Sequence, residues 1–219
     1  MSPPVAFVLT GFGKFFDVED NPTTKLIEWL STDLEGGSDN FNLLAGVVLG
    51  VSGEDVREWL PRLSSLLASE PRPVVLLSLG VAKAECFRLE TTAFNKACFR
   101  CPDERGWQPQ ASCIDEALPL DYPVACPLPL ERIHVNLLGS GFRVELSSDP
   151  GRFVCNYLYY ATSTAAAARP HCYSLFVHVP HFAQIDEPTQ RRFVLATMRA
   201  VAAAAADAAS GYDPEKALL

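Results

Sequence analysis

Cys155 stands in a local setting that favours a reactive thiolate. It follows the turn-rich segment Ser147–Gly151 and belongs to Phe153–Asn156, which predicts the first turn of a helix. Unpaired backbone N–H groups and the positive end of the helix dipole stabilise a thiolate at such a position, and the same groups can bind an oxyanion. Cys155 is therefore a candidate nucleophile. The alternative is a free cysteine packed in the core.

His178 is a candidate general base. It ends the apolar run Leu175–Val177 and precedes Val179 and Pro180, which places it at the carboxyl end of a predicted strand. Ligand sites in open α/β sheets form at that edge, and a histidine there can activate a cysteine at a helix start. A buried histidine with satisfied hydrogen bonds is the alternative. The other histidines have weaker contexts, typical of structural or surface positions: His134, His171 and His181.

Glu90 lies among apolar and β-branched neighbours in Leu89–Asn95. A carboxylate in such surroundings needs a buried partner, and a histidine would serve. Bonded to His178, it would fix the imidazole tautomer and stabilise the imidazolium, completing a set of nucleophile, base and orienting residue. A solvated carboxylate at the end of a strand is the alternative, since spacing along the chain does not show that the three residues meet.

Alternating strands and helices have to position these residues. Apolar runs predict strands, and apolar residues at helical spacing predict helices between them. The strands are expected at 5–10, 43–51, 74–79, 142–146 and 175–179, and the helices at 26–30, with Thr23 or Thr24 as its cap, 56–67, 130–138, 153–168 and 190–209. This order is typical of βαβ units, and it predicts a single α/β domain over 1–219, a three-layer α/β/α sandwich around a mostly parallel twisted sheet.

The segment from Phe99 to Leu130 interrupts this order. Prolines recur through this segment, and its apolar residues follow neither the period of a strand nor that of a helix. The segment is therefore expected to be an irregular excursion that can cover a site.

Composition limits the classes of function. A chain of 219 residues with 48% hydrophobic and 20% charged residues has the make-up of a globular domain. Its net charge of −8 disfavours nucleic acid and anionic membranes as partners. No signal peptide or membrane span is visible, so a cytoplasmic protein is expected. The seven cysteines are then expected as reduced thiols.

Four segments carry a resemblance to a known family. They are Thr10–Phe15 with Asn21-Pro22-Thr23, Glu90-x-x-Ala93-x-Asn95 followed by Arg100-x-Pro102-Asp103, Ser147-x-x-x-Gly151-x-Phe153-Val154-Cys155-Asn156, and His178-Val179-Pro180. In this order they resemble the signatures of pyroglutamyl peptidase I, the cysteine peptidases that remove an N-terminal pyroglutamyl residue. The match extends over most of the chain.

The resemblance implies a role for each candidate residue. Cys155 is the nucleophile, His178 the general base and then acid, and Glu90 the residue that orients His178. Attack on the pyroglutamyl carbonyl gives a thioester, which water hydrolyses. The substrates are peptides with N-terminal pyroglutamate, and no cofactor or metal is implied. Both a monomer and a homo-oligomer are compatible with the family.

The resemblance also implies a substrate pocket. The residues assigned to substrate binding are Phe12, Phe15, Asn21, Arg100, Phe153 and Val154. A flat, uncharged lactam suits an apolar, aromatic slot. Arg100 aligns with an arginine next to the catalytic centre, where it can support the oxyanion or the thiolate. The alternatives are a salt bridge from Arg100 to Asp103 or Glu104, and ordinary core positions for Phe12 and Phe15.

The chain departs from the family pattern at a few positions. After Gly80 the family has Gln, often followed by Gly-Gly-Arg, whereas this chain has Val81–Glu85 and is one residue shorter before Glu90. This difference concerns substrate recognition. Pro150 replaces an Ala before Gly151, and Glu104 stands where Asn is usual, but the catalytic positions are retained.

Two other classes of function compete with a peptidase. The first is a non-catalytic protein of the same fold that binds blocked N-termini or a small lactam. The second takes Cys98-x-x-Cys101 as half of a metal or redox site, with Cys86 and Cys113 at equal spacing on either side. No second CxxC or histidine pair completes a zinc pattern, so the sequence favours a site without metal.

Overall fold

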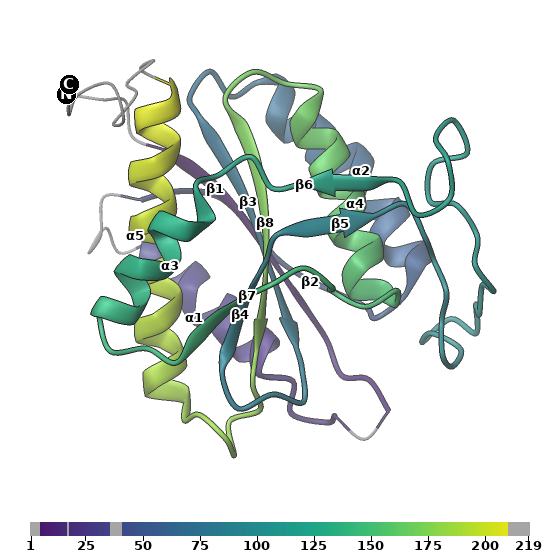
Figure 1. The fold of residues 1–219 in the computed structure, drawn as a ribbon, viewed down its shortest axis with the longest axis horizontal. Helices are drawn as coiled ribbons and strands as arrows, with labels where there is room; N and C mark the ends of the chain where they lie inside the picture. The colour runs from purple at the N-terminus through teal and green to yellow at the C-terminus, as the bar shows by residue number, and fades with distance from the viewer. Residues whose placement is uncertain (1–4, 17, 36–40, 210–219) are drawn as a thin grey trace.

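The apolar runs of the sequence assemble into a twisted sheet at the centre of the molecule (Figure 1). The computed structural model describes residues 5–16, 18–35 and 41–209. The sheet has six strands in the order β2 (Asn42–Leu49), β1 (Ala6–Phe12), β3 (Val74–Val81), β8 (Cys172–Val179), β4 (Phe87–Glu90) and β7 (Val144–Ser147). A separate antiparallel pair is formed by β5 (Thr92–Phe94) and β6 (Pro123–Ala125).

Helices cover both faces of the six-stranded sheet (Figure 1). α1 (Pro22–Glu35), α3 (Leu130–Gly139) and α5 (Glu187–Ala209) lie on one face, and α2 (Gly53–Ala68) and α4 (Val154–Ala167) lie on the other. Each face has its own cluster of buried apolar side chains. The predicted three-layer α/β/α sandwich around a mostly parallel sheet is thus confirmed.

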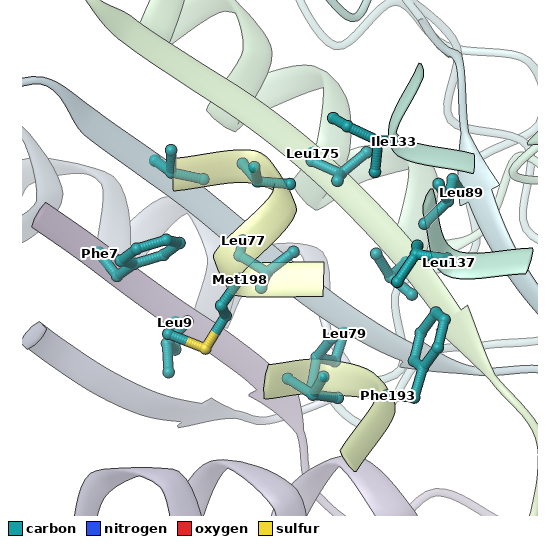
Figure 2. Packing of buried hydrophobic residues seen from close by; sticks show 14 of the residues in the cluster. Phe7, Leu9, Leu77, Leu79, Leu89, Ile133, Leu137, Leu175, Phe193 and Met198 are labelled. Carbon is teal, nitrogen blue, oxygen red and sulfur yellow. The ribbon is translucent and has the colours of Figure 1, made fainter. Parts of the chain in front are cut away.

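Alternation along the central strands supplies both clusters. Successive side chains of a strand point to opposite faces, so a continuous apolar run is buried on both sides. Phe7 and Leu9 of β1 pack with Leu77 and Leu79 of β3 toward Met198 of α5 (Figure 2). Their neighbours in β1 pack on the opposite face, against α2 and α4: Ala6, Val8 and Phe12.

The strand β4 departs from the parallel direction. β2, β1, β3 and β8 run parallel, β4 runs antiparallel to β8, and β7 runs parallel to β4. Only residues 82–86 separate β3 from β4, too few for the crossover that a parallel connection needs. In the backbone register of β4 and β8, Arg88 therefore lies opposite His178. Glu90 lies opposite Phe176, deeper in the sheet.

The start of α1 corrects one expectation. We expected Thr23 or Thr24 to cap this helix, but α1 begins at Pro22 and the side chain of Asn21 accepts the bond from the backbone N–H of Thr23 (3.1 Å). Proline suits the first helical position because its missing N–H would have no partner there. Asn21 is therefore the capping residue.

The irregular excursion is confirmed for residues 99–122, although β6 is a short strand within the predicted segment. Buried Asn95 anchors it: its amide nitrogen donates to the carbonyls of Asp115, Leu118 and Pro119, and its oxygen accepts from the N–H groups of Ile114 and Asp115. Within residues 5–16, 18–35 and 41–209, every helix is too short or too polar to span a lipid bilayer.

Candidate active site

Cys155 lies in the first turn of α4, as its sequence context predicts. The chain enters the helix through a turn in which Gly151 has φ +78 and donates its N–H to the Asp149 carboxylate (3.1 Å). Phe153 is the N-cap residue and supplies no side-chain acceptor to the helix. Because the first N–H groups of a helix have no intrahelical acceptor, they are available to an anion formed beside the partly exposed Cys155 thiol.

His178 and Glu90 form a buried pair. Nδ1 of His178 lies 2.7 Å from Oε1 of Glu90, and their side chains are 9% and 1% exposed. A carboxylate only accepts hydrogen bonds, so Nδ1 donates its proton to Glu90 and Nε2 remains available to another group. The side chain of Cys155 also acts on His178 and raises the pKa of the imidazole. The tertiary structure therefore brings the three predicted catalytic residues together.

The surroundings of His178 favour its protonated form. Burial lowers the pKa of the imidazole, but the hydrogen bonds and charges of Cys155 and Glu90 outweigh burial and raise the pKa from 6.5 to about 9. An imidazolium beside Cys155 stabilises the thiolate, which is the nucleophilic form of cysteine. This arrangement can attack a carbonyl and supply a proton to a leaving group.

Tyr159 connects the helix of Cys155 to the strand of Glu90. It lies one turn after Cys155 on α4, and its buried hydroxyl donates to the main-chain carbonyl of Glu90 (2.8 Å). Burial raises the pKa of the hydroxyl, which keeps it a donor. Its ring packs 5.8 Å from that of Phe176, which in turn lies 4.9 Å from the His178 ring. Sequence reasoning missed Tyr159, for which only its spacing from Cys155 was a signal.

Asn156 ties the start of α4 to the segment that follows Glu90. Its amide oxygen accepts from the N–H of Phe94 (2.9 Å), and its amide nitrogen donates to the carbonyls of Phe94 (2.9 Å) and Lys96 (3.0 Å). The side chain is fully buried. The asparagine that follows Cys155 thus fixes the helix against β5.

Gly80 leaves the space that the Cys155 thiol and the Phe176 ring occupy. It pairs with His178 across β3 and β8. A Cβ atom at this position would lie 2.7 Å from the Phe176 ring and 3.1 Å from Sγ of Cys155. The first distance is shorter than any van der Waals contact, so one of the rings or strands would have to move.

The Gly80→Ala variant is expected to lose about 10- to 100-fold in kcat, because a small displacement of reacting groups costs this much. Overpacking should also lower the free energy of unfolding by about 1–3 kcal/mol. Steady-state kinetics and thermal unfolding measure both effects. Gly139→Ala is the matched control, since a Cβ at Gly139 meets nothing within 4 Å. Equal kinetics in the two variants would contradict the tight fit around Gly80.

The apolar residues assigned to substrate binding fall into two groups. Phe12 and Val154 are 3% and 0% exposed and belong to the core. Phe15 and Phe153 are partly exposed, with ring centroids 5.2 Å apart. Asn21 caps α1 and also donates to the carbonyl of Gly13 (2.8 Å), so it holds the loop that carries Phe15. An apolar aromatic wall therefore stands beside the helix of Cys155.

Further aromatic residues extend this wall, and sequence reasoning missed them. Phe99 packs 4.7 Å from Phe153, and Trp107 packs 5.1 Å from Phe99. Both come from the irregular excursion, where no periodic pattern indicated that their side chains would pack with these aromatic residues.

Arg100 lies over the aromatic wall. Its side chain is exposed, and the guanidinium carbon is 5.9 Å from the centroid of Phe153. Its alternative partners are engaged elsewhere: the Asp103 carboxylate accepts from the N–H groups of Gly53 and Trp107, and Glu104 accepts from the N–H of Phe16. Arg100 is thus placed where its charge can act on a group bound against Phe153.

Cys126 adjoins this arrangement, because its thiol interacts with the hydroxyl of Tyr159. All cysteines are free thiols, and no group of three His, Cys, Asp or Glu side chains in the described ranges is placed to hold a metal ion. A cavity of about 300 Å³ lies at the other end of α4, lined in part by Ser163, Ala166 and Arg169. It is remote from Cys155 in the first turn of the same helix.

Comparisons with known proteins identify a family for this chain. The family described as pyroglutamyl peptidase matches residues 5–210. The pyrrolidone-carboxylate peptidase of Bacillus subtilis is 34% identical over 66% of this chain and 67% of its own, and that of Thermococcus litoralis is 28% identical over 80% and 76%.

Solved structures share the fold. The pyrrolidone carboxyl peptidase from Thermococcus litoralis superposes with a TM-score of 0.77 at 22% identity, covering 92% of this chain and 93% of its own. That from Thermus thermophilus has a TM-score of 0.71 at 23% identity, covering 88% and 98%.

Proposed function

Because the chain belongs to the pyroglutamyl peptidase family, whose curated relatives are pyrrolidone-carboxylate peptidases, we propose that it hydrolyses the amide bond after an N-terminal pyroglutamyl residue. The observation that carries this proposal is the buried 2.7 Å bond between His178 and Glu90 beside the Cys155 thiol. The nucleophile, the base and its orienting group are then in mutual reach.

The first half of the reaction forms a thioester. Sγ of Cys155 attacks the pyroglutamyl carbonyl carbon while His178 holds the thiol proton. The oxygen of the tetrahedral intermediate becomes negative and is stabilised by N–H groups of the first turn of α4. His178 then donates the proton to the amide nitrogen, the C–N bond breaks, and the shortened peptide leaves as an amine.

The second half releases pyroglutamate. His178, now neutral, takes a proton from water as the water oxygen attacks the thioester carbonyl. The C–S bond breaks and His178 returns its proton to the sulfur. Glu90 keeps the Nδ1 proton in place throughout, so the imidazole presents Nε2 to each proton transfer.

Recognition of the pyrrolidone ring rests on the aromatic wall. Phe15 and Phe153 offer apolar faces to a flat, neutral lactam, and Phe12 and Val154 support them from the core. A free α-amino group would bring an unpaired charge to the same surface, which is unfavourable. This difference underlies the proposed selectivity for blocked N-termini.

The experiment that tests the proposal compares two fluorogenic amides with the reduced protein. We expect release of the fluorophore from pyroglutamyl-aminomethylcoumarin and none above background from alanyl-aminomethylcoumarin. A folded, reduced protein that hydrolyses neither would overturn the proposal. Calorimetric binding of a pyroglutamyl peptide in that case would favour the non-catalytic binding protein.

The Glu90→Gln variant is expected to lose about 10²- to 10⁴-fold in kcat, less than loss of the nucleophile. A glutamine cannot stabilise the imidazolium, and its amide permits the wrong tautomer of His178. The loss should lie mainly in kcat, with KM nearly unchanged, because Glu90 does not touch the substrate. Glu145→Gln is the control, since this exposed carboxylate lies on β7 and pairs with Arg88. Full activity in Glu90→Gln would exclude the orienting role.

A further inference from the structure

Phe16 is an exposed aromatic residue close to the candidate active site. Its side chain is 64% exposed, although large apolar residues are normally buried or shielded. Its backbone has φ +49, in the left-handed region that bulky residues rarely adopt. Strained residues of this kind cluster at ligand-binding sites, where the surrounding structure holds them.

Specific contacts hold Phe16 in this conformation. Phe15 and Val18 exchange backbone hydrogen bonds of 3.3 and 2.8 Å, so Phe16 lies in the tight turn between them. The N–H of Phe16 donates to the carboxylate of Glu104 (3.4 Å), which links the turn to the excursion. The exposed ring is therefore presented from a turn anchored on both sides.

The ring of Phe16 continues the aromatic wall toward solvent. It packs edge to face on Phe15 at 4.7 Å, and Phe15 packs on Phe153 at 5.2 Å. Phe153 is the N-cap residue of the helix that carries Cys155. The aromatic surface thus begins beside the nucleophile and ends at Phe16.

We propose that Phe16 forms the subsite for the side chain of the residue that follows pyroglutamate, and that this subsite favours apolar and aromatic side chains. The inference rests on the proposed function. If the lactam packs on Phe15 and Phe153, the exposed ring of Phe16 adjoins it through Phe15 and offers an apolar surface to the next residue of the peptide.

Charge adds to the discrimination. The Glu104 carboxylate accepts from the N–H of Phe16, so an acidic side chain packed on Phe16 would meet a like charge, whereas the Arg100 guanidinium lies over Phe153. An aromatic or aliphatic side chain would instead remove apolar surface of Phe16 from water. The expected order of substrates is therefore phenylalanine above alanine above aspartate in the second position.

The experiment measures kcat/KM for the amides of pyroglutamyl-phenylalanine, pyroglutamyl-alanine and pyroglutamyl-aspartate, by chromatography of the released amine. The unaltered protein should prefer phenylalanine over alanine by about three- to tenfold, the gain of a partly exposed apolar contact. In Phe16→Ala this ratio should fall to near one. Phe16→Leu should retain part of it, because leucine keeps an apolar surface.

Val135→Ala is the matched control. Val135 is also 64% exposed, but it lies on α3, away from the helix of Cys155, and its removal should leave the preference unchanged. A phenylalanine-to-alanine ratio at or below one in the unaltered protein, or an equal ratio in Phe16→Ala, overturns the subsite while pyroglutamyl hydrolysis persists. Absence of hydrolysis of all three substrates overturns the proposed function and the subsite with it.

Discussion

The Cys155→Ala variant is expected to lose at least about 10⁴-fold in kcat toward a pyroglutamyl amide, because no other group in the site can form the acyl intermediate. Neither His178 nor Glu90 can replace the sulfur: the first holds the proton, and the second is buried behind it. The fold should be unaffected, since Cys155 is partly exposed and alanine suits a helix. Fluorophore release and thermal unfolding measure both points.

Cys172→Ala is the control for this variant. Cys172 is a buried free thiol at the opposite end of β8 from His178. Its replacement tests whether the loss of a cysteine outside the site also lowers activity. The control should keep its activity after reduction. Complete labelling of Cys155 by iodoacetamide should abolish activity in the unaltered protein. Full turnover by Cys155→Ala would show that the mechanism proposed above is wrong.

The His178→Ala variant is expected to lose about 10³-fold or more in kcat, because it removes the proton donor for the leaving amine and the cation that stabilises the thiolate.

The pH dependence of kcat/KM in the unaltered protein reports the protonation of His178. The pKa of His178 is raised from 6.5 to about 9, so kcat/KM should persist through neutral pH and fall as pH rises through about 9.

The free energy of unfolding should also depend on the protonation of His178. The folded-state pKa of His178 exceeds its unfolded value, so the folded protein binds this proton more tightly. The resulting stabilisation is fully present below pH 6.5 and is lost as pH rises through about 9. Thermal unfolding between these pH values should show this component in the unaltered protein and lack it in His178→Gln. If kcat/KM already declined as the pH rose above about 6.5, this result would contradict the raised pKa of His178.

Local patterns in the sequence predicted the elements that carry the site. The turn before Phe153 predicted the helix start at Cys155, and the apolar run before His178 predicted the strand β8. Such signals depend only on neighbouring residues, since helix ends and buried strands have short periodic signatures. The boundaries were less accurate, because the start of α1 depends on Asn21 and Pro22, which lie outside the apolar pattern.

The contacts within the site did not follow from local patterns. Glu90 reaches His178 because β4 runs antiparallel beside β8, and this direction depends on the short connection after β3. Three residues of the site belong to types that are common in any core, and their roles depend on their tertiary contacts: Tyr159, Gly80 and Phe99. Phe12 and Val154 show the converse, because residues aligned with a substrate pocket lie in the core of this chain.

The sequence alone determined the α/β alternation, the helix that presents Cys155, the strand that ends at His178 and the resemblance to a peptidase family. These properties are local or depend on residue types in order. The tertiary structure decided that Glu90 meets His178, that Gly80 leaves room for the thiol and that Phe16 stays exposed beside Phe15. These contacts join residues on different strands, helices and turns, so the packing of the whole sheet and its helices sets their distances.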